Sequence, residues 1–395
     1  MTFVLRIVVN SRFFLRINRL KIPHKITLNC QKNLCSQTLS SSEMSSTKKG
    51  NLSKIVALLN EFMPPSLAES WDNVGLLVEP TKPHHVSKIL LTNDLTPEVL
   101  NEAIDLKANF ILSYHPPIFS PLKRLCQSSW KQKLIVRAIE NRIAIYSPHT
   151  SCDALKNGVN DWFLSAFENA STSPLSTKEN PAFSFSHSVK VTVDVANHSS
   201  FLENLKKLSG VQILNDSARE DTFFVSFLCK KSSLQTIAQI LKSHSIQDPV
   251  FTEVAKPPMP DTGIGRIAKL QTSITLTEAI EIIKKHLKLP HLRVATAHGP
   301  GFSFTDKTIK TVAVCAGSGS TVLRGVSADL YVSGEMSHHD VLDAIHNGSS
   351  VLLCEHSNTE RGYLSQLKIS LENLLSELTV EVCVSNIDAD PLKIN

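Results

Sequence analysis

The chain has 395 residues, of which 42% are hydrophobic and 19% charged, and this length and balance are typical of a globular protein with two or three domains. It contains no apolar stretch of ~18 residues, which excludes a membrane-spanning helix. Seven lysines and arginines precede the first acidic residue, Glu43, so the net charge of +5 leaves the rest of the chain near neutral, without the basic footprint of a nucleic-acid-binding protein.

Residues 1–47 form a basic N-terminal extension in which Lys and Arg are interleaved with apolar residues and then give way to serines. This composition is typical of either a mitochondrial transit peptide or a disordered basic tail, and both interpretations stay open. Because Met44 directly precedes the globular part, a second start site there would give a cytoplasmic form beside a mitochondrial one. Eight scattered cysteines without a CxxC pair favour a reducing compartment.

Residues 48–168 have the alternation of helices and apolar strands that is typical of an α/β fold. The expected elements are a helix over Leu52–Phe62, a strand over Ile89–Leu91, a helix over Pro97–Lys107, a strand over Asn109–Ser113, a helix over Trp130–Asn141 and a strand over Ile143–Tyr146. Thr96 is a candidate N-cap, with Pro97 at the first helical position. Continuous apolar strands of this kind predict a parallel or mixed sheet covered by helices.

Two breaks divide the rest of the chain. Residues 169–181 are rich in Ser, Thr, Asn and Pro and have the composition of a linker. Residues 183–258 follow the order βαββαβ and predict an inserted ferredoxin-like domain, which ends at the proline-rich segment 256–260. The α/β alternation resumes over residues 259–395, with a helix at Leu276–His286 and strands that include Leu330–Val332 and Val351–Leu353.

Ligand-type side chains follow three of the apolar strands. The candidates are His115 after the first strand, His149 and Asp153 after the second, and His356 and Glu360 after the third. The carboxyl ends of parallel strands meet at one edge of a sheet, so these side chains can converge into a metal site with nitrogen and oxygen ligands. Any one of them alone is more simply read as a surface charge or a helix cap.

Two further polar segments follow strands in the last part of the chain. The turn Gly317-Ser318-Gly319-Ser320 is either a tight strand-to-helix connection or a phosphate-binding turn, since it lacks the lysine of a P-loop. His338 and His339 follow the strand at Leu330–Val332. Neighbours at the start of a helix point about 100° apart, so we expect at most one of them to face the site.

Six ordered motifs resemble the NIF-three-like family, which is also called the GTP cyclohydrolase 1 type 2 family. They are Trp71–Leu76, Tyr114–Pro117, Ser147–Thr150 with Asp153, Ala316–Gly319, Ser333–Asp340 and Glu355–Gly362. The resemblance covers most of residues 52–392. It implies two related α/β halves split by an inserted domain, assembly into a homo-oligomer, and a dinuclear metal centre between the halves.

Carried over by motif, the implied metal ligands are His115, Asp153, His356 and Glu360, with Glu360 bridging two ions of zinc, iron or manganese. Many bacterial members have two consecutive histidines where this chain has Tyr114 and His115. A phenol with a pKa near ~10 is a poorer ligand at neutral pH than imidazole, which predicts that one of the two metal sites is weak or empty.

Two functions follow as expectations. In the first, the protein is a metal-dependent hydrolase of a small phosphorylated or nucleotide-like substrate, with His149, His338 or His339 moving protons and Gly317–Ser320 holding a phosphate. The family's second name implies GTP as one such substrate. In the second, which the family's name implies, the protein is a nuclear or cytoplasmic interaction protein that associates with a transcription co-regulator, and its metal site is structural or vestigial.

Overall fold

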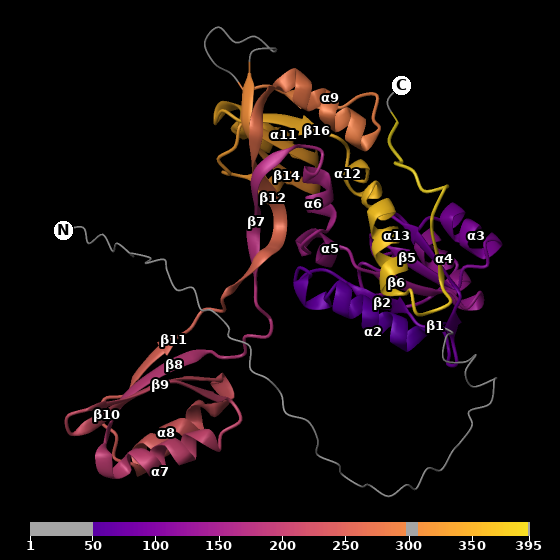
Figure 1. The fold of residues 1–395 in the computed structure, drawn as a ribbon. Coiled ribbons are helices and arrows are strands. Elements are labelled where there is room, and N and C mark those ends of the chain that lie inside the picture. The colour runs from indigo at the N-terminus through magenta and orange to yellow at the C-terminus, as the bar shows by residue number, and fades with distance from the viewer. Residues whose placement is uncertain (1–49, 298–306, 394–395) are drawn as a thin grey trace, which may run out of the picture. The chain divides into compact units, whose positions relative to one another are not determined.

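The computed structural model of the protein describes residues 50–297 and 307–393, so the predicted targeting segment lies outside the described residues. No helix in this part of the chain has the length and apolar character needed to cross a bilayer. The region after residue 50 forms the expected alternation of strands and helices (Figure 1). Its elements are β1 (Gly50–Asn51), α2 (Leu52–Phe62), a 3₁₀ turn (Pro65–Leu67), β2 (Gly75–Val78), β3 (His85–Val86), β4 (Lys88–Thr92), α3 (Pro97–Asp105), β5 (Phe110–Ser113), α4 (Trp130–Glu140), β6 (Ala144–Ser147), α5 (Thr150–Ala154) and α6 (Val159–Leu164).

Local sequence signals set the helix starts in this region. Thr96 caps α3 by accepting a hydrogen bond from the backbone N–H of Val99 at 3.3 Å, and Pro97 occupies the first turn, as predicted. The strands β17 (Glu381–Val384), β4, β5 and β6 are parallel, and β2 closes the far edge of this five-stranded sheet antiparallel to β6. The C-terminal strand β17 therefore belongs to the first sheet, although the sequence placed all of 259–395 in the second half.

The prediction of a linker over 169–181 was wrong. All but the last two of these residues form the strand β7 (Asn169–Glu179), which pairs antiparallel with β12 (Pro258–Thr275) at the edge of a six-stranded sheet. Because an edge strand faces solvent along much of its length, it carries Ser and Thr instead of the apolar run that marks a central strand. The proline-rich segment 256–260 is not a simple break either, because β12 starts within it, at Pro258.

The six-stranded sheet has the order β13-β16-β15-β14-β12-β7, and its central strands β14, β15 and β16 are parallel. Its remaining elements are α9 (Leu276–Leu287), β13 (Arg293–Ala295), β14 (Thr308–Ser318), α10 (Ser320–Leu323), β15 (Leu330–Glu335), α11 (His338–His346), β16 (Ser350–Leu353), α12 (Asn358–Arg361) and α13 (Tyr363–Leu374). The prediction of an α/β fold with mixed sheets is confirmed.

The segment between β7 and β12 has a sheet and a core of its own. Its elements are β8 (His187–Asp194), α7 (Val195–Lys206), β9 (Val211–Arg219), β10 (Thr222–Cys229), a 3₁₀ turn (Lys231–Ser233), α8 (Leu234–Ser243) and β11 (Val250–Glu253). The strands form a fully antiparallel sheet in the order β11-β8-β10-β9. Alternate residues of β8 pack with both helices in one apolar cluster that includes Val191, Phe201 and Ile237.

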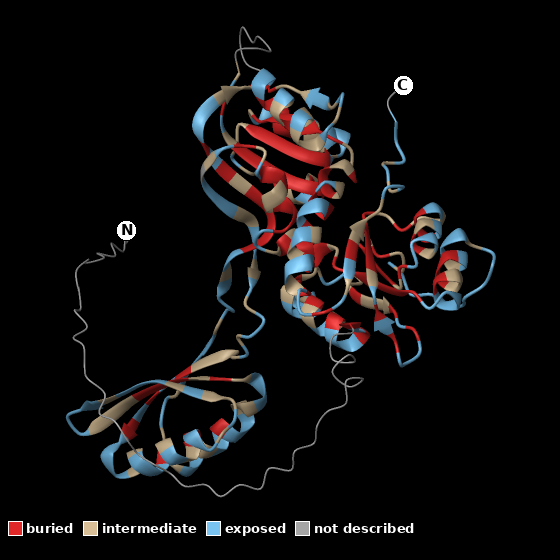
Figure 2. Cartoon of the chain, turned by 45° about the vertical axis from the view of Figure 1, so that its right-hand side comes forward, coloured by how far each residue is buried: buried red, intermediate tan, exposed pale blue. Residues whose placement is uncertain are grey.

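Buried residues concentrate in the strands of the two larger sheets and in the helices against them (Figure 2). One apolar cluster takes residues from both sheets, and α2, α6, α9 and α13 contribute to it. Helices α3 and α4 cover the other face of the five-stranded sheet, and α10 and α11 contribute to a cluster on the six-stranded one. Since each parallel strand is covered on both faces, the polar residues at its carboxyl end stand out as candidates for function.

Candidate metal centre

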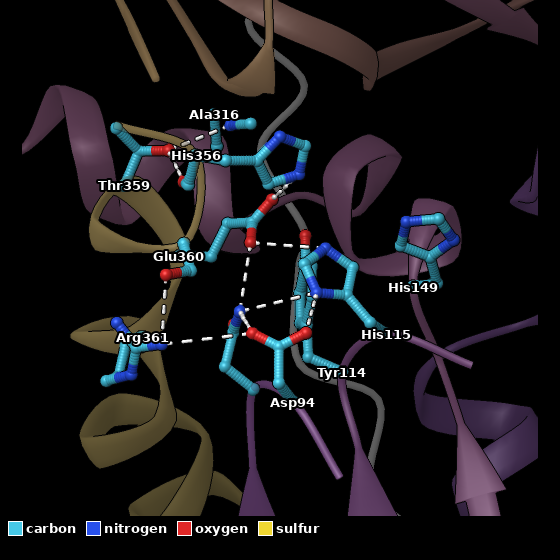
Figure 3. Close-up of polar contacts among 12 residues, drawn as sticks. Asp94, Tyr114, His115, His149, Ala316, His356, Thr359, Glu360 and Arg361 are labelled. Atoms are coloured by element: carbon cyan, nitrogen blue, oxygen red, sulfur yellow. Dashed lines mark hydrogen bonds and ion pairs between the residues drawn. The ribbon is translucent and has the colours of Figure 1, made fainter. Parts of the chain in front are cut away.

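The carboxyl ends of strands from both sheets supply the proposed ligands. His115 follows β5, His149 and Asp153 follow β6, and His356 and Glu360 follow β16 on a loop and on α12. His115 and Glu360 follow strands of different sheets and are in contact, so residues from both sheets form the candidate centre (Figure 3). The sequence pattern predicted the strand ends, but only the tertiary structure shows which ends meet.

His115, His356 and Glu360 form a compact cluster. One ligand atom of each lies within 4.8 Å of the others. The Nε2 atom of His115 is 3.3 Å from Glu360 Oε2, and the Nε2 atom of His356 is 3.4 Å from Glu360 Oε1. The Glu360 carboxylate therefore lies between two imidazoles (Figure 3), and this side chain is only 4% exposed.

Each imidazole also contacts a second carboxylate through its Nδ1 atom. Asp94 Oδ1 is 2.9 Å from His115 Nδ1, and Glu335 Oε1 is 2.8 Å from His356 Nδ1. Because an ionised carboxylate only accepts hydrogen bonds, each Nδ1 carries a proton and each Nε2 is turned towards Glu360. Carboxylate–histidine pairs of this kind fix the tautomer and orientation of metal-ligating histidines.

Electrostatics at His115 follow from its two acidic neighbours. Burial alone lowers the pKa of this imidazole, but the charge of Glu360 and the hydrogen bond to Asp94 outweigh burial and raise the pKa to about 10. Burial raises the pKa of Glu360, yet the charge and hydrogen bond of His115 leave it below its usual value. Without a metal ion, His115 and Glu360 are thus an imidazolium–carboxylate pair.

Asp153 is held by Tyr114 instead of joining the three-residue cluster. The phenol of Tyr114 donates a short hydrogen bond to Asp153 Oδ1, and the Tyr114 side chain is fully buried. Burial raises the pKa of Asp153 to about 6, and burial with the charge of Asp153 raises the pKa of Tyr114 well above its ordinary value. The phenol is therefore neutral and already committed to Asp153.

His149 lies on the far side of His115 in Figure 3, with the two ring centroids 5.2 Å apart. Its Nδ1 donates to Asp72 Oδ1 at 2.8 Å, so Nε2 is the atom left for a substrate. The backbone of His149 has φ 31° and ψ −117°, a conformation that costs a non-glycine residue about 1–3 kcal/mol. The strained residue also lines a cavity that opens beside the cluster.

The other predicted residues lie elsewhere. His338 and His339 are exposed on the first turn of α11, and His338 lines a separate hollow with Met336 and Arg293. In the predicted phosphate turn, the N–H of Gly317 donates to Thr359 Oγ1 and the N–H of Gly319 donates to the Glu335 carbonyl. These two donors are already used, which disfavours a phosphate at Gly317–Ser320.

Gly317 has a different relation to the cluster. Its φ is 64°, and a Cβ atom built on it would lie 2.7 Å from Glu360 Oε1 and 3.1 Å from His356 Nε2. The ligand atoms are thus packed against a backbone that only glycine supplies without strain. Ala316 holds this strand end in place, because its N–H donates to Asn160 Oδ1 at 2.9 Å.

A cavity of about 540 Å³ opens beside the cluster. Its lining includes Trp71, His149, Asp153, Ser318, His356 and Glu360. The Trp71 side chain is 60% exposed and its ring packs against Phe119 and His149. None of the described lining residues is Lys or Arg, so histidine is the one side chain there that can become cationic.

The donor set fits a divalent cation. Two imidazole nitrogens and a buried carboxylate are ligands for zinc, iron or manganese, and the supporting carboxylates complete the usual second layer around such an ion. Negative charge is also in excess, since Asp94, Asp153, Glu335 and Glu360 surround two imidazoles. His115, His356 and Glu360 are the residues that would hold the first ion, with Asp153 nearby.

Sequence reasoning missed the supporting residues. Asp94 follows β4, so the strand-end rule that selected His115 could also have selected it. Glu335 ends β15 inside the motif Ser333–Asp340, whose histidines are the more conspicuous residues. Asp72 lies inside the motif Trp71–Leu76, but no strand-end pattern marks it as a partner of His149, which it meets only through the tertiary fold.

Comparison with known proteins gives consistent matches, each over most of the chain. The family model described as Duf34/NIF3 (NGG1p interacting factor 3) matches residues 50–391. NIF3-like protein 1 of Rattus norvegicus is 44% identical over 87% of this chain and 93% of its own length, and NGG1-interacting factor 3 of Saccharomyces cerevisiae is 31% identical over 88% and 98%. Among solved structures, Staphylococcus aureus protein SA1388 matches with a TM-score of 0.68 and 26% identity, over 87% of this chain and 99% of that one.

Proposed function

Because the chain belongs to the Duf34/NIF3 family, we propose that it binds a divalent metal ion at His115, His356 and Glu360 and hydrolyses a small phosphorylated or nucleotide-like substrate there. The observation that carries the proposal is the pairing of two carboxylate-anchored imidazoles on one buried carboxylate, next to a cavity of about 540 Å³. A divalent ion bound there supplies Lewis acidity, which activates water and withdraws charge from the bond that is cleaved.

Residues of this chain would supply the remaining chemistry. His149 lines the cavity with its Nδ1 engaged by Asp72, so its Nε2 can accept a proton from water and return it to a leaving group. The exposed Trp71 ring forms a wall on which a planar group of the substrate can stack. His338 and His339 were predicted as alternative proton carriers, but their exposed positions on α11 favour His149.

The charge of the cavity limits the class of substrate. With neither Lys nor Arg among the described lining residues, a polyphosphate would have no fixed cationic side chain to neutralise it. We therefore favour a substrate with a single phosphate or similar anionic group placed at the metal, and we rank GTP below it.

A second candidate function is an interaction protein whose metal site is structural. The Saccharomyces cerevisiae relative is named NGG1-interacting factor 3, which supports a transcription co-regulator as partner for this chain. Tyr114, in place of a ligand histidine, also fits this alternative. A metal-loaded protein that turns over no member of a phosphate-ester and nucleotide panel, yet retains such a partner, would favour it over the hydrolase.

Elemental analysis of purified protein after loading with zinc, manganese or iron tests the metal site. We expect one ion per chain in the unmodified protein and two in Tyr114→His, because imidazole replaces a neutral phenol that is committed to Asp153. Two ions in the unmodified protein would instead mean that Tyr114 does not block the second position. No ion in either protein would refute the metal centre.

Metal binding is also expected to release protons. His115 has a pKa of about 10 in the metal-free protein but must be neutral to bind a metal ion, so about one proton leaves this residue per ion bound at pH 7–9. The affinity for zinc should therefore rise about tenfold per pH unit over that range. Calorimetric titration in buffers of different ionisation enthalpy measures the released protons. A pH-independent affinity would contradict the His115–Glu360 ion pair.

A further inference from the structure

The segment that follows β17 crosses from the first sheet to the metal-ligand loop of the second. It is anchored on strand β4 and helix α3, since the Ser385 N–H donates to the Leu91 carbonyl at 2.8 Å and the Asn386 N–H donates to Glu102 at 2.8 Å. Its carboxylates then reach the residues next to the cluster. Ser385–Asp390 thus touches both parts of the chain that supply ligands.

Asp388 makes the central contacts. Its side chain is 2% exposed, its Oδ2 accepts from the Asn93 N–H at 2.7 Å, and its Oδ1 accepts from Arg361 Nη2 at 3.3 Å. Asn93 in turn donates from Nδ2 to Glu360 Oε2 at 3.2 Å. Arg361 directly follows Glu360, and its Nη2 lies 3.9 Å from Asp94 Oδ2. Asp388 is therefore linked to the cluster through one intervening residue in each direction, through Asn93 on one side and through Arg361 on the other.

Asp390 adds a second link to the ligand loop of the second sheet. Its Oδ2 accepts from Ser357 Oγ at 2.6 Å, and Ser357 Oγ also accepts from Arg361 Nη2 at 2.9 Å. Hydrogen bonds to charged carboxylates are stronger than neutral ones, and those of Asp388 are shielded from water. A surface tail that merely rested on the protein would need neither a buried carboxylate nor contacts to both ligand loops.

We propose that Ser385–Asp390 is a clasp that holds the ligands from the two sheets in register, with Asp388 as its positioning residue. Asp388 contacts no ligand atom itself; it fixes the backbone of Asn93 and the guanidinium of Arg361, between which His115 and Glu360 are set. The inference rests on the proposed metal site. It assigns the C-terminal segment, which lies outside the six motifs, an effect on metal affinity that acts through Asn93 and Arg361.

The test compares Asp388→Ala and the isosteric Asp388→Asn with a charge-matched control in the full chain. Glu381→Gln also removes one carboxylate from the C-terminal region, but Glu381 pairs with Lys88 on the neighbouring strand and lies away from the cluster. Zinc affinity is measured by competition with a chelator, and thermal unfolding is recorded with and without zinc. We expect both Asp388 variants to bind zinc about 10–100-fold more weakly and the control to bind normally.

The two unfolding curves separate positioning from ordinary stabilisation. A purely structural role lowers the unfolding temperature equally with and without zinc, whereas a positioning role also shrinks the increase that zinc produces. Equal zinc affinity and an equal zinc-induced increase in Asp388→Asn would overturn the clasp while leaving the metal site intact. Failure of the unmodified protein to bind zinc would overturn both, so the two failures are distinguishable.

Discussion

Replacing Glu360 with glutamine is expected to remove nearly all bound metal from the protein. Within residues 50–297 and 307–393, Glu360 is the carboxylate that faces both His115 Nε2 and His356 Nε2, at 3.3 and 3.4 Å. Glutamine keeps its volume while losing its charge. Loss of one charged ligand should weaken zinc binding by about two to three orders of magnitude, which elemental analysis after dialysis and chelator competition both measure. Hydrolysis of any substrate found should fall with the metal content.

Glu355→Gln is the matched control for this experiment. Glu355 lies on the loop just before α12 but pairs with Arg293, at 2.9 Å, instead of with the cluster. It should keep its metal and its activity. The pKa of His115 provides an independent readout, because without the Glu360 charge it should fall from about 10, visible by NMR titration of the metal-free protein. Metal content that is unchanged in Glu360→Gln would rule out the proposed site.

The sequence alone predicted the α/β fold and the strand ends at which the candidate ligands lie. Apolar runs such as Phe110–Ser113 are buried on both sides, so their pattern is strong and the polar residue that follows each is conspicuous. Parallel pairing then makes the strand ends neighbours within each sheet. This reasoning selected five candidate side chains, of which the structure brings His115, His356 and Glu360 into one cluster. His149 and Asp153 lie beside that cluster and line the cavity.

The remaining features depend on contacts between distant parts of the chain. β7 is a polar edge strand, so its sequence resembles a loop until its partner β12 is known. β17 pairs with β4 across almost the whole chain, which no local pattern encodes. Asp94 and Glu335 become recognisable as supporting residues only when the imidazoles they hold are located.

Substitution of Gly317 by alanine is expected to weaken metal binding by displacing a ligand side chain, without removing any ligand atom. The added Cβ would lie 2.7 Å from Glu360 Oε1, closer than real contacts allow, so the buried carboxylate has to move. No ligand atom is removed, yet we expect zinc affinity to fall about 10–100-fold, as for other changes that misplace a ligand. Because φ is 64° at this position, alanine there should also lower the folding stability by about 1–2 kcal/mol.

Gly325→Ala isolates the backbone part of that effect. Gly325 has φ 75° and nothing within 4 Å of its added Cβ, so it carries similar strain without touching the cluster. Both variants should therefore show a similar loss of stability in denaturant unfolding of the metal-free protein, and only Gly317→Ala should lose zinc. If Gly325→Ala loses zinc equally, strain alone explains the effect. If neither does, Glu360 can move without cost, and the close fit of Gly317 against the ligands has no role in metal binding.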